Sequence, residues 1–255
     1  MTQTSLGLLV LLALACSSSP VSVGDDRQGA SDGGNGGASP GGSGGDGTTA
    51  GEAGASNGRP TADALLGLLE PCIQISNGQL AREAGKAKDI PVCGFGSAVY
   101  WTSQLSVDCD GKRTDTCNAQ TDPQSSDSTL GKDSGGESLD AAAVPFVEVP
   151  RASSAFDYEA AGLRMGSVVA VIYQGRLAYG VLGQEQAQDV IGAASVAMAN
   201  DLGINSDPIR GGLQTKDVTY LAFEGNEWVA PALEDVTQSA ALAERAASEL
   251  LAAGR

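Results

Sequence analysis

The sequence has no histidine among its 255 residues. A serine triad needs histidine as its base, so this type of nucleophilic catalysis is excluded. Zinc sites are also disfavoured, because histidine ligands are missing and the cysteines form no CxxC pairs. The Asp-rich stretch DCDGKRTDTCNAQTD (residues 108–122) lacks the glycine and the terminal glutamate of an EF-hand loop. We therefore predict no metal site and no cofactor.

Positive charge is scarce. The chain has 15 Lys and Arg against 31 Asp and Glu, a net charge of −16, and most of the excess lies beyond residue 60. An acidic domain repels the phosphates of nucleic acid and favours polycationic partners, so no nucleic acid is expected as a partner. The alternative is that the acidity only keeps an exported protein soluble.

Long apolar runs are limited to the N-terminus, MTQTSLGLLVLLALAC (residues 1–16). This run is too short to span a bilayer as a helix and is typical of a secretory signal peptide. Its LALAC ending resembles a lipobox, which predicts a lipid anchor on Cys16 and an exported, membrane-anchored lipoprotein facing the periplasm or the cell exterior. No Lys or Arg precedes the apolar run, so an ordinary cleaved signal peptide is the alternative.

Large apolar side chains are nearly missing from residues 17–60, which hold 14 glycines in 44 residues. Such a segment cannot bury enough surface to offset the entropy of ordering it, so we predict a disordered tether. Residues 61–97 are predicted to form a helical, Cys-bearing extension. Residues 98–255 are predicted to form the main domain.

Four cysteines remain once Cys16 is set aside. An even number in an exported chain indicates two disulfides. Sequence alone allows three pairings, and the short loops favour Cys72 with Cys93 and Cys109 with Cys117.

Periodicity and turn residues predict a mainly β fold with peripheral helices. Beyond the short apolar stretch Val99–Trp101, the sequence predicts an irregular region that begins as a surface loop. Further along, two apolar runs meet at Gln174-Gly175, which predicts a hairpin over residues 166–183. Further strands are expected at residues 143–150 and 218–225, and helices at 61–70, 192–203 and 234–254, the last with Asp235 as its N-cap and Gln238 as the capping-box partner. A small closed β-barrel would bury these apolar strands without an exposed edge.

Five collinear blocks between residues 98 and 224 resemble the glycoside hydrolase family 75 chitosanases. They are VDCDGKRTDTCNAQTDP, LDAAAVPFVEVP, FDYEAAGLRMGSVVAVIYQGRLAYGVLG, IGAASVAMANDLGINSDP and GLQTKDVTYLAF. A looser similarity to double-psi β-barrel domains predicts a barrel of that type. The resemblance implies an endo-acting, inverting hydrolase that cuts the β-1,4 bonds of chitosan, a cationic polymer of glucosamine.

Such a hydrolase needs one carboxylic acid for the leaving oxygen and one carboxylate for the attacking water. The family motifs Gly-Asp-x-Gly-Pro and Gly-Glu-Ala-Ser fall on residues 183–187 and 192–195. There Gln184 stands in place of the Asp and Ala193 in place of the Glu. Neither side chain can transfer a proton, so the resemblance implies lost or much reduced hydrolysis.

Glu185 and Asp189 are the nearest acids that could substitute. Glu185 is expected to point away from Gln184, because neighbouring side chains of an extended segment alternate, and Asp189 is expected to cap the following helix. Asp108, Asp110 and Tyr179 are the candidates for binding substrate. Three hypotheses remain: a degenerate chitosanase that binds chitosan, an active chitosanase with relocated acids, and an interaction lipoprotein without a sugar ligand.

Overall fold

The computed structural model describes residues 58–254. The predicted signal peptide, Cys16 and all but the last residues of the predicted tether lie outside this range, and the division of the chain into four parts stays a prediction. Within the described range, none of the helices has the length and apolar character needed to cross a membrane.

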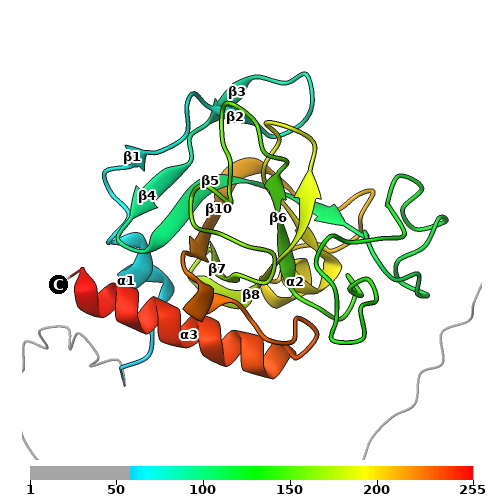
Figure 1. Ribbon diagram of the computed structural model, residues 1–255. Helices are drawn as coiled ribbons and strands as arrows, with labels where there is room; N and C mark the ends of the chain where they lie inside the picture. The colour runs from blue at the N-terminus through cyan, green and yellow to red at the C-terminus, as the bar shows by residue number, and fades with distance from the viewer. Residues whose placement is uncertain (1–57, 255) are drawn as a thin grey trace, which may run out of the picture. The chain divides into compact units, whose positions relative to one another are not determined.

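Six strands close into a β-barrel, as predicted (Figure 1). Around the barrel they follow the order β5, β10, β7, β8, β6, β9 and back to β5. The β5–β9 and β6–β8 pairs are parallel, and the other four pairs are antiparallel. The strands are β5 (Ala98–Asp108), β6 (Phe146–Pro150), β7 (Val168–Tyr173), β8 (Arg176–Gln186), β9 (Ala193–Ser195) and β10 (Leu213–Phe223).

The predicted hairpin is confirmed as β7 and β8, which pair from Val168↔Val181 to Tyr173↔Arg176. Gln174 and Gly175 both have positive φ, 47° and 76°, which is the backbone that a tight two-residue hairpin requires. The strands are apolar on both faces because each face is buried. Val169 and Val171 face one apolar cluster. Val168, Ala170 and Ile172 face another.

One cluster fills the inside of the barrel, and the other covers its outside. The inner cluster includes Trp101 and Tyr220, whose rings stack with their centroids 5.2 Å apart. The outer cluster includes Phe146 and residues of α3 (Val236–Ala253), which covers this side of the barrel. Asp235 caps α3 by accepting a hydrogen bond from the amide of Gln238, as the sequence predicts.

The remaining elements surround the barrel. Strands β1 (Ile73–Gln74) and β4 (Cys93–Phe95) extend the sheet beyond β5, and β2 (Leu80–Ala81) pairs with β3 (Lys88–Ile90). The helical elements are α1 (Ala62–Leu66), α2 (Val196–Asp201) and the 3₁₀ turn η1 (Asn226–Trp228). Helix α1 ends at Leu66, short of the expected 61–70, because beyond it the amides of Leu68 and Leu69 bond to the carbonyls of Leu65 and Leu66, only three residues back.

The surface loop expected beyond Trp101 begins only after Asp108, because β5 continues to that residue as a central barrel strand, and from Cys109 on the loop is pinned by a disulfide. Two polar residues of β5, Ser103 and Gln104, are buried. Gln104 is 2% exposed and donates to the carbonyls of Arg82 and Ile191.

The helix expected from Gly192 was also wrong in its first turn. Ala193–Ser195 form β9, and α2 begins only at Val196, with Ser195 as its N-cap. The turn expected at residues 183–187 is instead the end of β8, where Gln186 pairs with Pro150 of β6.

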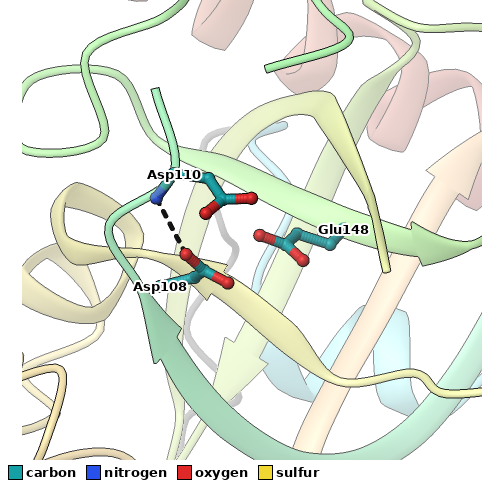
Figure 2. A group of neighbouring side chains, drawn as sticks. All are labelled: Asp108, Asp110 and Glu148. Carbon is teal, nitrogen blue, oxygen red and sulfur yellow. Dashed lines mark hydrogen bonds between the residues drawn. The ribbon is translucent and has the colours of Figure 1, made fainter. Parts of the chain in front are cut away.

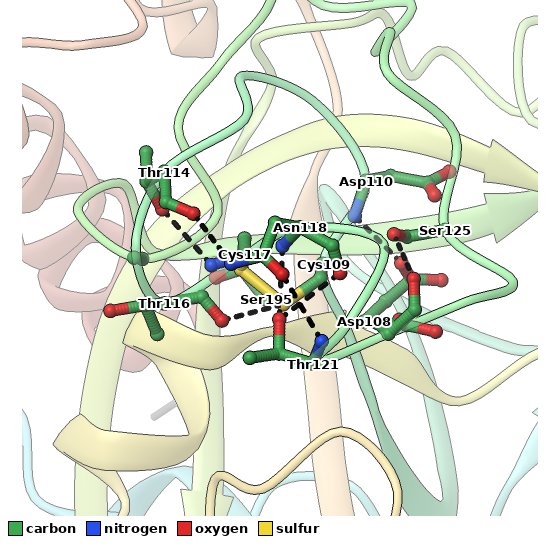
Figure 3. Close-up of a disulfide and its surroundings, with 12 residues drawn as sticks. Asp108, Cys109, Asp110, Thr114, Thr116, Cys117, Asn118, Thr121, Ser125 and Ser195 are labelled. Atoms are coloured by element: carbon green, nitrogen blue, oxygen red, sulfur yellow. Dashed lines mark hydrogen bonds between the residues drawn. A yellow bond between two sulfur atoms is a disulfide. The ribbon is translucent and has the colours of Figure 1, made fainter.

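Both predicted disulfides are confirmed, Cys72–Cys93 and Cys109–Cys117. The second pins the loop that follows β5 (Figure 3). Inside that loop the amide of Cys117 donates to Thr114 Oγ1, and Asn118 Nδ2 donates to the Thr114 carbonyl.

Gly192 is expected to be indispensable to barrel closure. It has φ of 110°, and an added Cβ would lie 2.5 Å from Ser103 Oγ and 2.8 Å from Gln104 Nε2. We expect Gly192→Ala to lower the free energy of unfolding by about 3 kcal/mol, from backbone strain plus overpacking. The measurement is urea unfolding. Gly175→Ala is the control, because it has a similar φ with nothing within 4 Å, and should cost only about 1 kcal/mol. Equal losses in both variants would contradict the steric argument.

Candidate functional site

Four strands bring the candidate site together on the outer face of the barrel. Glu148 of β6 is in register with Gln184 of β8, and Asp108 of β5 with Ser195 of β9. Phe146 belongs to the outer apolar cluster, and Glu148, two residues further along the strand, faces the same side. Ala193 pairs with Ser106, two residues before Asp108. The two positions that the resemblance makes catalytic therefore adjoin a group of acids.

Gln184 is held by hydrogen bonds at both ends of its amide. Its Nε2 donates to Asp110 Oδ2 at 2.8 Å and to the Ser128 carbonyl at 3.0 Å. Its Oε1 accepts from the backbone amides of Leu130 and Glu185, each at 3.0 Å. The side chain thus ties β8 to the loop after β5 and is a structural link with no proton to transfer.

Ala193 is 1% exposed and presents only a methyl group. Its strand, β9, lies between β5 and β6, so its neighbours are backbone of both strands. The position can therefore neither accept nor donate a proton.

Three carboxyl groups converge beside Gln184. One oxygen from each of Asp108, Asp110 and Glu148 lies within 4.8 Å of the others (Figure 2). The backbone amide of Asp110 donates to Asp108 Oδ1 at 2.8 Å, and that of Ser126 donates to Asp110 Oδ1 at 2.5 Å. Among the described residues, no Lys or Arg forms an ion pair with any of the three. We call this group the carboxylate cluster.

Burial shifts the protonation of the carboxylate cluster. Removal from water raises the pKa of Glu148 well above its usual value, and the charges of Asp108 and Asp110 raise it further. The pKa of Asp108 rises to about 7, chiefly by burial and then by the neighbouring charge of Asp110. Without a bound cation, burial and the two acidic neighbours therefore favour the protonated form of Glu148.

Glu148 was missed by sequence reasoning. The available signal was a single acid in the otherwise apolar strand PFVEVP, where it lies between Val147 and Val149. A buried acid in such a strand is expected either to be protonated or to pair with a group of opposite charge.

An acidic pocket of about 630 Å³ lies next to the carboxylate cluster. Glu83, Asp108 and Asp122 are its three charged residues, and all are acidic. A second pocket of about 570 Å³ shares Pro208 and Ile209 with the first, so the two adjoin. The second pocket carries one acid and one base, Asp207 and Arg210, so the negative charge that suits a positively charged ligand is concentrated in the first. The full lining of the acidic pocket is Glu83, Ser106, Val107, Asp108, Asp122, Pro123, Gln124, Ser125, Pro208 and Ile209.

Residues 105–254 match the sequence profile described as fungal chitosanase of glycosyl hydrolase group 75. The chain belongs to this family. It is 31% identical over 140 residues to endo-chitosanase C of Aspergillus oryzae, covering 53% of this chain and 34% of that protein. It is 29% identical over 149 residues to an endo-chitosanase of Aspergillus fumigatus, covering 55% of this chain and 62% of that protein.

A further endo-chitosanase, from Aspergillus oryzae strain ATCC 42149 / RIB 40, is 29% identical over 161 residues, which cover 56% of this chain and 66% of that protein. The chain thus spans between 34% and 66% of the length of these relatives. Family membership is shown, and the activity of this chain is a separate question.

The two candidate substitutes for the family acids are both engaged elsewhere. Glu185 accepts a hydrogen bond from Tyr158 Oη at 2.9 Å and lies 3.8 Å from Arg151 Nε, on the opposite side from Gln184. Asp189 bonds to Lys88 Nζ at 2.7 Å and Ser153 Oγ at 2.6 Å, and these bonds lower its pKa. Asp189 does not cap α2, because Ser195 does.

Of the candidate binding residues, the structure places Asp108 in the acidic pocket and Asp110 behind it, bonded to Gln184. Tyr179 lies on β8 against the outer apolar cluster under α3. Burial and the nearby Glu244 raise the pKa of Tyr179 to about 12. Tyr179 does not line the pocket that contains Asp108.

The carboxylate cluster should make stability depend on pH. In buffer with a chelator, Asp108, whose pKa rises to about 7, holds its proton in the folded state between about pH 4 and pH 7, where the unfolded state has lost it, and the raised pKa of Glu148 acts in the same direction. The unfolded state then binds fewer protons, so the free energy of unfolding falls as pH rises through this window, by about 2 to 4 kcal/mol. Urea unfolding at a series of pH values measures this slope.

Glu148→Gln should make the slope shallower, leaving the part that Asp108 contributes, and should be more stable than the unmodified protein at pH 7, because a neutral amide replaces the buried acid. Asp115→Asn, an exposed change in the same disulfide loop, is the control and should keep the slope. The same slope in Glu148→Gln as in the unmodified protein would show that Glu148 is not the titrating group.

Proposed function

We propose that this domain binds chitosan in the acidic pocket, with hydrolysis lost or much reduced. The observation that carries the proposal is a pocket with three acidic and no basic lining residues, next to Gln184 and Ala193. Membership of the chitosanase family supports chitosan as the polymer. The ammonium groups of chitosan complement an acidic surface, which raises the association rate and selects against anionic polymers.

Loss of hydrolysis follows from the chemistry of the two family positions. An inverting glycosidase needs a proton donor on one side of the bond and a base for water on the other. Removing one positioned acid or base usually costs about 10² to 10⁴ in rate. Here both are replaced, and Gln184 is committed to four hydrogen bonds.

An active chitosanase with relocated acids is the second candidate. Asp108 favours it, because it is the one member of the carboxylate cluster that lines the pocket. Support is weaker than for binding alone, since its cluster partners lie within 4.8 Å while an inverting pair stands about 6.5 to 9.5 Å apart. Glu185 and Asp189 are already held by other residues.

A lipid on Cys16 completes the proposal. Together with the Gly-rich segment of residues 17–60, it would hold the domain near a membrane surface, outside the cytoplasm. The two disulfides support export, since such bonds persist in oxidising compartments. An interaction lipoprotein without a sugar ligand is the third candidate and is separated by the binding test below.

Removing charge from the pocket should weaken chitosan binding. We expect the double variant Glu83→Gln/Asp122→Asn to raise the dissociation constant for chitosan oligomers about tenfold, because it removes two of the three pocket charges. Binding of the unmodified protein should also weaken with added salt. Isothermal titration calorimetry measures both.

The matched control is Asp115→Asn/Glu137→Gln, which removes the same charge from exposed positions outside the pocket. Its affinity should stay within about twofold of the unmodified protein. Neutral, fully acetylated chitin oligomers are the control ligand. Equal weakening in both double variants would indicate that only net charge matters, and no binding at all would support the interaction lipoprotein.

Restoring the family acids tests the loss of hydrolysis. The unmodified protein should release no reducing sugar from soluble chitosan above background, and Gln184→Asp/Ala193→Glu should gain measurable turnover. Turnover by the unmodified protein would contradict the loss and favour relocated acids. No turnover by the double variant, with circular dichroism showing that it is folded, would mean that the site lost more than two carboxylates.

A further inference from the structure

We propose that the carboxylate cluster of Asp108, Asp110 and Glu148 is a calcium-binding site. The three residues come from β5, the turn after it, and β6, and their carboxyl groups point toward one another (Figure 2). The proposal is independent of sugar binding, because it rests on the arrangement of these oxygens alone.

Glu148 is the strongest indication of a bound cation. It is 2% exposed, and its Oε1 has no hydrogen-bond partner among the described residues. A buried polar atom without a partner costs about 1 to 3 kcal/mol, and more for a charged group, so natural proteins rarely leave one. The carboxyl group is directed into the cluster, where a cation would supply the missing partner.

The surrounding groups neutralise little of the cluster's charge. Two backbone amides and the Gln184 amide donate to Asp108 and Asp110, and the part of the chain described contains no Lys or Arg paired with them. Ionised together, three carboxylates so close to one another would repel strongly in a partly buried setting. A divalent cation allows all three to be ionised, whereas without one the raised pKa values of Glu148 and Asp108 favour their protonated forms.

The spacing of the oxygens fits calcium. Calcium binds oxygen at about 2.3 to 2.6 Å, so ligands on opposite sides of the ion stand up to about 5 Å apart. Magnesium demands near-octahedral geometry and dehydrates reluctantly, so it suits a set of three protein carboxylates less well. One oxygen from each carboxyl group lies within 4.8 Å of the others, inside the span of ligands around one calcium ion.

The ligand set and access also fit. Carboxylates bind calcium through one or both oxygens, so three of them supply between three and six of the six to eight oxygens that it takes. Asp108 lines the acidic pocket, from which water completes the shell and the ion enters. Gln184 is compatible with a cation at this site. An acid at this position would add a fourth negative charge, whereas the Gln184 amide donates a hydrogen bond to Asp110.

The test uses the full chain, purified in detergent and stripped of metal with a chelator. Titration with calcium chloride in a calorimeter should show one calcium per chain with a dissociation constant of about 1 mM or lower. Calcium should also raise the thermal unfolding temperature, because it binds only the folded state. Magnesium chloride in a parallel titration should bind at least about tenfold more weakly.

Glu148→Gln should weaken calcium binding at least tenfold and abolish the thermal shift, because the amide supplies one neutral oxygen in place of a carboxylate. Asp115→Asn, outside the cluster, should behave as the unmodified protein. If Glu148→Gln does not fold, Asp110→Asn carries the same expectation, since it removes a different carboxylate from the cluster while its remaining oxygen still accepts from the Ser126 amide. No thermal shift at about 10 mM calcium, equal binding by the cluster variants, or stronger binding of magnesium would overturn the assignment.

Discussion

The buried hydroxyl of Ser195 is the interaction on which the rest of the site depends. It donates to the carbonyl of Val144 at 2.9 Å and accepts from the amides of Phe146 and Met198 at 3.0 and 3.2 Å. One side chain thus fixes the start of β6, ends β9 and begins α2. Because β9 is only three residues long and closes the barrel between β5 and β6, this fixation sets the distance between Asp108 and Glu148.

The corner that the family uses for catalysis is reorganised in this chain around hydrogen bonds. Gln184 joins the end of β8 to the loop after β5, and the end of β8 pairs with β6 as far as Pro150. A neutral amide can donate to Asp110, which a carboxylate at that position could not do. Gln184 therefore places a hydrogen-bond donor beside the carboxylate cluster, where an ionised acid would be repelled by Asp110.

Local patterns predicted the parts of the structure whose causes are local. The Gln174-Gly175 turn, the capping of α3 by Asp235 and the short disulfide loops each depend on neighbouring residues. The full length of β5 was not predictable in this way, since the partners of its buried Gln104 are the carbonyls of Arg82 and Ile191. The carboxylate cluster was hidden for the same reason, because Glu148 meets its neighbours across 40 residues of chain and a disulfide loop. Sequence indicated Asp108 and Asp110 but could not show that a third acid faces them.

Asp108 belongs both to the carboxylate cluster and to the wall of the acidic pocket. A cation held by the cluster takes up part of the negative charge that an ammonium group in the pocket would otherwise meet. Two ligands that draw on one carboxylate are coupled, and the coupling is reciprocal by thermodynamic necessity. Calcium bound at Glu148 would therefore weaken the contribution of Asp108 to the proposed polymer binding and leave that of Glu83 and Asp122 to dominate. The acidic pocket and the carboxylate cluster are thus two sites that share one residue, Asp108.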